Sequence, residues 1–368
     1  MSVRILWLVL LSAFVLSGCP ELPDHGAKIL HIVDTCCDEI SGAGGMVIAF
    51  YSRDGEEEGW LTDYRSYAGS PNWTSDGDRI LYICNGDIML MDQDGGNKKA
   101  VLEDSGAFLL RLSADEKRAV YLKPSDSVSY EVRSVNLDGT DDKVLVTGAN
   151  ERVLGVAPVT GRILFSRTTE EPDPIYTTQN TIVYRIYSMA PDGSGEVELC
   201  GDYADGITLG EISPDGQLAI LFAKRNLPPD TPEVALPYSW AKVVARVDGT
   251  GEPAIVMDGL MVLADYETEW PHFNLDGSRL AFADGAKIVT MTPQLGDRKE
   301  LALSNEAGIS SVYFDPGNDG RLWFHAESLP ALGFTQYASG AASLNLDGTD
   351  LRREPVGPAA REAYQPGR

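Results

Sequence analysis

Short apolar runs and clusters of turn residues alternate along this chain at regular intervals. Within residues 70–102 the apolar or alternating runs cover 70–74, 79–84, 88–92 and 98–102. The runs are separated by Ser75-Asp76-Gly77-Asp78, Asn85-Gly86-Asp87 and Gln93-Asp94-Gly95-Gly96. Asp-Gly between apolar runs favours a hairpin, because glycine adopts a positive φ without steric cost. This stretch therefore predicts four short antiparallel strands joined by three turns.

The same two turns recur along the rest of the chain. The first recurs at 113–116, 158–161, 213–216, 274–277 and 315–320, each time before an apolar run. The second recurs as Asp-Gly-Thr or Asp-Gly-Ser at 138–140, 192–194, 248–250 and 347–349. A period of roughly 40 to 60 residues is typical of propeller blades, and one four-stranded unit cannot bury both of its faces alone. The pattern therefore predicts blades that stack on one another.

Two stretches carry a resemblance to a known family. SPNWTSDGDRILYI with IMLMDQDGGNKKAVL, and the later EISPDGQLAILF, resemble the WD40-like β-propeller repeats of the TolB family, whose units read like SPxWSPDGxxIAF…IYxMDxDGxxxxxLT. The resemblance implies an all-β fold, a single β-propeller of four-stranded antiparallel blades. It says little about function, because propellers of this type serve as partner-binding proteins, as accessory domains and sometimes as enzymes.

The two ends of the chain predict how the ring closes. Runs at 28–33, 46–51 and 59–61 look like a blade that lacks its first strand. Residues 364–368, YQPGR, resemble the start of a blade that stops after its first turn. A strand from the C-terminus would complete the N-terminal blade and remove the open sheet edges. This closure predicts about seven blades, and six is the alternative if the ends do not pair.

The first residues predict export and anchoring. Arg4 precedes a short apolar run, and Leu16-Ser17-Gly18-Cys19 resembles a bacterial lipobox. We expect residues 1–19 to be a lipoprotein signal peptide ending in a lipidated Cys19, residues 20–26 a tether, and residues 27–368 the propeller. An ordinary signal peptide with a chance cysteine is the alternative. The expected location is the bacterial cell envelope, anchored to a membrane through lipid and facing the periplasm or the cell exterior.

Charge and composition narrow the classes of function. The net charge is -25, with 55 acidic and 30 basic residues, which argues against nucleic acid as a partner. Many of the aspartates fall in the turns, and no run has the spacing of a Ca²⁺-binding loop. The 4 histidines have no metal-ligand spacing, and no nucleophile elbow or phosphate loop is present. The sequence therefore predicts no catalytic residue, metal or cofactor.

Aligning the first turns gives two registers in the inner strands. One register is large and apolar, and we expect it to pack blade against blade: Trp73, Leu112, Ala157, Ile212, Phe273, Phe314 and Tyr364. The preceding register contains the candidate ligand-binding residues of the central channel, namely Asn72, Arg111, Glu211, His272 and Tyr313. Inner strands line the channel of a propeller, so these side chains could converge there. A solvated channel wall is the alternative.

Insertions give a second candidate surface. The insertions at 170–181, 226–238 and 327–341 separate second from third strands, and 257–268 joins two blades. In an antiparallel blade these connections fall on one face, opposite the Asp-Gly turns, and long loops on a rigid scaffold often bind partners. The candidate contacts on this loop face are Tyr176, Leu236, Tyr238, Trp240 and Phe334. Loops that pack only on their own blades are the alternative.

The sequence leaves three hypotheses for function. The leading one is a noncatalytic, lipid-anchored propeller that binds an envelope protein or a cell-wall polymer through its loop face. The rival is a hydrolase or lyase centred in the channel at Glu211 and His272. The third is a propeller that acts only beside a separate enzyme.

The exported location favours oxidation of some of the cysteines. Cys36 and Cys37 follow the second strand of the N-terminal blade, and Cys84 ends the second strand of the next. Both positions are expected on the loop face, so we predict a disulfide from Cys37 (or Cys36) to Cys84. Reduced cysteines or a Cys36–Cys37 bond are the alternatives. Cys200 is expected to be a packed thiol in an outer strand.

Overall fold

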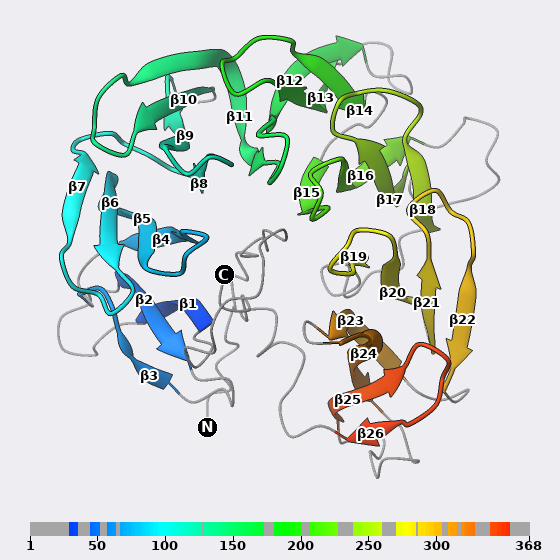
Figure 1. The fold of residues 1–368 in the computed structure, drawn as a ribbon. Helices are drawn as coiled ribbons and strands as arrows, with labels where there is room; N and C mark the ends of the chain where they lie inside the picture. The colour runs from blue at the N-terminus through cyan, green and yellow to red at the C-terminus, as the bar shows by residue number, and fades with distance from the viewer. Residues whose placement is uncertain are drawn as a thin grey trace, which may run out of the picture.

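The computed structural model describes residues 29–35, 45–51, 57–63, 67–126, 129–172, 180–200, 207–226, 238–259, 270–284, 286–303, 308–315, 318–327 and 339–353. In these ranges the regular structure is strand, arranged as a ring of radiating antiparallel sheets (Figure 1). The described strands form seven such units, which we name blades A to G in chain order. No helix in the described residues is long and apolar enough to cross a membrane.

In each of the first four blades, successive strands lie progressively farther from the middle of the ring (Figure 1). Blade A contains β1 (Ile29–Thr35), β2 (Gly45–Tyr51) and β3 (Glu57–Trp60). Blade B contains β4 (Ala68–Trp73), β5 (Arg79–Cys84), β6 (Asp87–Asp92) and β7 (Lys99–Leu102). Blade C contains β8 (Leu110–Leu112), β9 (Arg118–Pro124), β10 (Tyr130–Asn136) and the first part of β11 (Lys143–Val156). The second part of β11 begins blade D, which continues with β12 (Ile163–Pro172), β13 (Asn180–Met189) and β14 (Val197–Cys200).

The last three blades repeat the same order. Blade E contains β15 (Ile207–Ile212), β16 (Leu218–Asn226), β17 (Tyr238–Arg246) and β18 (Ala254–Gly259). Blade F contains β19 (His272–Phe273), β20 (Leu280–Asp284), β21 (Lys287–Met291) and β22 (Lys299–Ala302). Blade G contains β23 (Gly308–Asp315), β24 (Asn318–Glu327), β25 (Ser339–Asn345) and β26 (Arg352–Arg353). The propeller predicted from the repeats is confirmed.

The first turn of a blade is held by its own side chains. In blade B the Thr74 hydroxyl donates to Asp76 Oδ1 at 2.5 Å, and Asp78 N–H donates to the same oxygen at 3.0 Å. Gly77 adopts a φ of 72°, where a side chain would be strained. The same hydroxyl-to-carboxylate bond occurs in blades C and E, from Ser113 to Asp115 and from Ser213 to Asp215. The repeated Ser/Thr-x-Asp sequence thus specifies this turn.

The core lies between blades. Six buried apolar clusters each combine side chains from two successive blades, from A and B through to F and G. Strand residues alternate between faces, so Ile80 and Tyr82 pack toward blade A while Leu81 and Ile83 pack toward blade C. The predicted packing register is confirmed for its described members: Leu112, Ala157, Ile212, Phe273 and Phe314 are buried in these clusters and Trp73 packs against one. Tyr364 lies outside the described residues.

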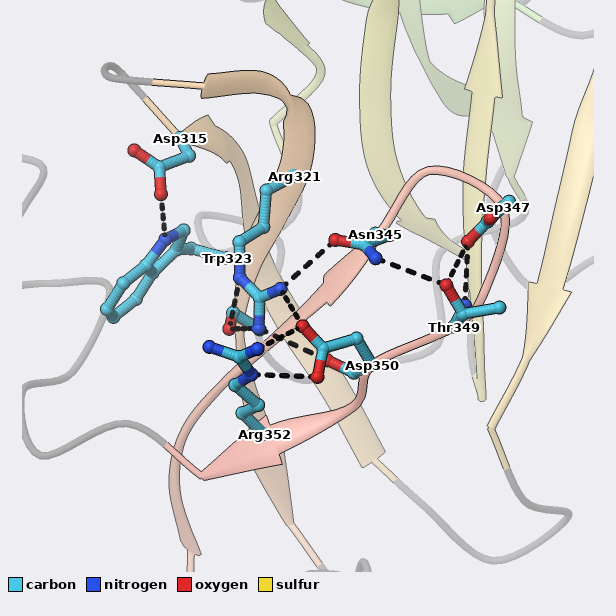
Figure 2. Close-up of polar contacts among 9 residues, drawn as sticks. Asp315, Arg321, Trp323, Asn345, Asp347, Thr349, Asp350 and Arg352 are labelled. Carbon is cyan, nitrogen blue, oxygen red and sulfur yellow. Dashed lines mark hydrogen bonds and ion pairs between the residues drawn. The ribbon is translucent and has the colours of Figure 1, made fainter.

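An arginine at the start of the second strand ties each of several blades together. In blade G the Arg321 guanidinium donates to Ser343 Oγ, to Asn345 Oδ1 at 3.1 Å and to Asp350 Oδ2 at 2.9 Å (Figure 2). Arg118 makes the same set of contacts in blade C, with Ser134, Asn136 and Asp141. Arg162 in blade D and Arg279 in blade F likewise reach the turn between the third and fourth strands of their own blades, at Gly195 and Asp297. We call this arrangement the arginine clamp.

The predicted signal peptide, the tether and the closing strand fall outside the described residues. These are residues 1–28 and 354–368, which include the lipidation candidate Cys19 and the expected pairing of 363–366 with the N-terminal blade. Within the described residues, β1 pairs with β2 alone. The seven units agree with the predicted blade number, and closure by the C-terminal segment stays a prediction.

Candidate inner-strand site

The candidate channel residues occupy equivalent positions on the inner strands. These strands lie nearest the middle of the ring, as β4, β8, β15, β19 and β23 show (Figure 1). The structure divides the five residues into two groups. Glu211, His272 and Tyr313 come from blades E, F and G, and Asn72 and Arg111 come from blades B and C. Val156, at the same position in blade D, is buried and supplies no polar group.

Glu211 connects blade E to blade F. Its Oε2 atom accepts the backbone N–H of Phe273 at 3.1 Å and lies 3.2 Å from Nδ1 of His272. The side chains of His272 and Glu211 are 23% and 16% exposed. A carboxylate that accepts from Nδ1 fixes the imidazole with its proton on that nitrogen when the ring is neutral. His272 Nε2 is then a hydrogen-bond acceptor.

Tyr313 extends the group to blade G. Its ring centroid lies 4.1 Å from that of His272, with the planes tilted by 41°. Among the described residues, no hydrogen bond reaches Oε1 of Glu211, Nε2 of His272 or the hydroxyl of Tyr313. We call these three residues the inner-strand cluster. Three partly exposed polar groups thus meet with hydrogen-bonding capacity left over.

A glycine and a tryptophan next to the cluster residues in sequence are in close contact. Trp270, two residues before His272, lies directly against Gly210, the residue before Glu211. The Trp270 ring also meets the Phe222 ring at 5.5 Å between centroids, and Lys242 Nζ lies 5.8 Å from its centre. Lys242 is itself buried. The start of blade F is therefore seated on the inner end of blade E by apolar contact as well as by Glu211.

Asn72 and Arg111 meet at the junction of blades B and C. The Asn72 amide donates to the carbonyls of Ser70 at 2.6 Å and Leu110 at 3.2 Å. The Arg111 guanidinium donates to the Leu110 carbonyl at 2.7 Å. Loss of water around Arg111 lowers its pKa to about 10, so it is still cationic at neutral pH. Asn72 therefore connects blade B to blade C, and Arg111 donates to the same carbonyl from within blade C.

The structure describes little of the other candidates. Tyr238 and Trp240 lie in β17, where they pair with Asn226 and Lys224. Cys84 ends β5 opposite Ala68, and Cys200 is buried at the end of β14. Tyr176, Leu236, Phe334, Cys19 and Cys37 lie outside the described residues. The loop-face contacts and the disulfide therefore stay predictions.

Two features were not anticipated from the sequence. The sequence does contain a pattern from which the arginine clamp could have been found. Arginine recurs after the first turn at 79, 118, 162, 279 and 321, with Ser or Asn near the second turn. The approach of Trp270 to Gly210 has none, because the two residues belong to different blades. Within the described residues, no group of three His, Cys, Asp or Glu side chains is placed to hold a metal ion.

Comparisons with known proteins agree on the fold. No protein-family model matches the chain, and no curated protein matches its sequence. The structure is similar to an oligogalacturonate lyase in complex with manganese, with a TM-score of 0.52 and 14% identity over 85% of each chain. An oligogalacturonate lyase from Vibrio parahaemolyticus gives a TM-score of 0.50 and 13% identity over 90% of this chain and 89% of that one.

TolB from Acinetobacter baumannii gives a TM-score of 0.46 and 17% identity over 76% of this chain. The chain spans 64% of that TolB, which is less than two thirds of its length. The similarity to the two lyases, at 14% and 13% identity, shows the fold alone and carries no function with it.

Proposed function

We propose that this protein is a noncatalytic β-propeller of the bacterial cell envelope that binds a protein partner or a cell-wall polymer through its loop face. The observation that carries the proposal is the length of three hairpins. In blades D, E and G the second and third strands form long hairpins. Their last described pairs are Pro172–Asn180, Asn226–Tyr238 and Glu327–Ser339. In blades B and F the corresponding hairpins turn at Cys84–Asp87 and Asp284–Lys287.

Long hairpins support a binding surface in a specific way. Each is a continuous antiparallel ladder as far as its last described pair, so the blade fixes where the loop begins and ends. The turns between first and second strands lie on the opposite face and contact one another: Ser75 N–H donates to Glu116, and the Thr160 hydroxyl donates to the Gly216 carbonyl. On that face, neighbouring turns therefore make hydrogen bonds to one another. The asymmetry favours the loop face as the one that meets a partner.

The binding proposal is tested by exchanging the hairpin tips. Residues 173–179, 227–237 and 328–338 would each be replaced by Asn-Gly, and the variants used to capture partners from detergent-solubilised bacterial envelopes. We expect at least one exchange to abolish capture while the protein remains folded. The matched control is Val159→Ser, which changes a 68% exposed side chain on the turn face. Capture that survives all three exchanges and is lost in the control would refute the loop face.

Anchoring is proposed on the sequence of residues 16–19, LSGC. A lipidated Cys19 would hold the propeller at a membrane as a TolB-like lipoprotein. Cys19→Ala should release the protein into the soluble fraction or leave its leader uncut, as seen by fractionation and lipid labelling. Cys200→Ala is the control, because this buried thiol lies in β14. Unchanged lipid labelling of Cys19→Ala would rule the anchor out.

A hydrolase or lyase centred on the inner strands is the second candidate. The geometry that favours it is the Glu211–His272 pair at 3.2 Å, because a carboxylate at Nδ1 leaves Nε2 able to take a proton from a substrate. Cleavage of a cell-wall glycan or peptide that is lost in His272→Gln, and strongly reduced in Glu211→Gln, would support this candidate. Turnover that is unaffected by both changes would exclude it.

A further inference from the structure

The inner-strand cluster has an unusual balance of hydrogen-bonding groups. Glu211 Oε1 accepts only, and Nε2 of the neutral His272 ring accepts because Nδ1 carries the proton shared with Glu211. The Tyr313 hydroxyl can accept or donate. None of the three has a hydrogen-bond partner among the described residues. Partly buried polar groups of this kind are normally satisfied by a ligand or by water.

The charges of the cluster select the sign of the ligand. Glu211 receives one backbone N–H and the imidazole, and neither contact supplies a permanent positive charge. The chain as a whole carries a net charge of -25, which raises the local concentration of cations. An anion would meet a carboxylate and two lone pairs here. A hydrogen-bond donor with a positive charge fits instead.

The number of acceptors selects the chemical class. A primary ammonium group has three N–H donors and no acceptor. The cluster offers three acceptors that come from three successive blades and are fixed relative to one another by the Glu211 bond and the His272–Tyr313 ring contact. We propose that Glu211, His272 and Tyr313 form a binding site for a primary ammonium group, such as that of a lysine side chain or an amino sugar. This site is independent of the loop-face binding proposed above.

The proposal is tested by NMR of the histidine side chains. The protein has 4 histidines, so ¹⁵N-labelled imidazoles are readily assigned. The probe is N-acetyl-lysine methyl amide, and its neutral isostere carries a hydroxyl in place of the ammonium. We expect a saturable shift at Nε2 of His272 with the amine and a much weaker response with the alcohol. Glucosamine and glucose then test whether an amino sugar is bound as well.

Variants separate binding from folding. Glu211→Gln should weaken amine binding by about tenfold, because it replaces a charge-assisted bond by a neutral one. Tyr313→Phe keeps the ring contact with His272 and removes one acceptor, so it should weaken binding by less. Glu103→Gln makes the same charge change at an exposed site in the turn after β7 and should have no effect. An equal response to amine and alcohol, no saturable response, or full affinity in Glu211→Gln would overturn the proposal.

Discussion

Gly210 and Trp270 are in such close contact that no side chain fits between them. A Cβ on Gly210 would lie 2.5 Å from two ring carbons of Trp270 and 3.1 Å from the Ile220 carbonyl oxygen. The ring has little freedom to retreat, since Phe222 and Lys242 pack on it. The glycine is required here for space, because its backbone is not in the left-handed region.

Gly210→Ala should therefore destabilise the junction of blades E and F by about 1–3 kcal/mol, the usual cost of overpacking. Urea unfolding followed by tryptophan fluorescence measures this, with a shift of the native emission as Trp270 moves. Gly69→Ala is the matched control, since Gly69 also lies in an inner strand and has no atom near its Cβ position. A Gly210→Ala protein as stable as the control would mean that the tryptophan relocates without cost.

The arginine clamp of blade G gives a second prediction. Arg321 is 8% exposed and holds Ser343, Asn345 and Asp350 together (Figure 2). Arg321→Lys keeps the charge but loses the planar fork that reaches three partners at once. We expect a loss of roughly 2–3 kcal/mol, because the buried Ser343 hydroxyl loses the bonds that it accepts from the guanidinium while Asp350 retains Arg352.

Arg352→Lys is the control for the clamp. Arg352 bonds to the same Asp350 carboxylate, but its side chain is 62% exposed. An exposed pair contributes only about 0–1 kcal/mol. Chemical denaturation of the two variants should separate them clearly. Equal losses would contradict the prediction, because they would mean that the buried contacts of Arg321 contribute no more than the exposed pair of Arg352 with Asp350.

Acid sensitivity should arise in the second turns. The carboxylates of Asp138, Asp192 and Asp347 each accept a Thr or Ser hydroxyl, the largest cause of a pKa held below its ordinary value. A lowered pKa in the folded state gives stability that is complete above the unfolded pKa of about 3.9. This stability is lost as the pH falls through the lower folded pKa.

The urea midpoint should therefore not change through these groups from about pH 7 to about pH 5, and should drop below about pH 4. The triple variant Asp138→Asn, Asp192→Asn, Asp347→Asn keeps an oxygen acceptor in each turn and removes the titration. Its stability should vary less with pH in the acid range. An identical acid dependence in the triple variant and the wild type would contradict this origin.

The fold could be predicted because the residues that specify its turns and strands lie close together in the sequence. The Ser/Thr-x-Asp turns and the alternation in strands such as β5 are both encoded within a few residues, and each repeat confirms the others. The inner-strand register followed from aligning those turns, so the sequence could place Glu211, His272 and Tyr313 at equivalent positions.

Distances between blades could not be predicted in the same way. Whether Glu211 reaches His272 while Asn72 and Arg111 share the Leu110 carbonyl depends on side-chain length and on how successive blades tilt. The Trp270 contact depends on a residue missing its Cβ one blade away. The hairpin insertions were placed correctly, although their first and last residues continue the strands, as Pro172 opposite Asn180 shows.

Closure of the ring gives the last prediction. In the described residues β1 pairs with β2 alone, which leaves its other edge for the segment 363–366. An unpaired edge exposes a row of backbone donors and acceptors. Deleting residues 361–368 should therefore cost several kcal/mol and reduce hydrogen-exchange protection of the β1 amides that face away from β2, such as that of Ile32. The control exchanges Arg361 and Arg368 for Gln, which keeps the length and the strand. If the deletion melts at the wild-type temperature and β1 keeps its protection, another segment covers that edge.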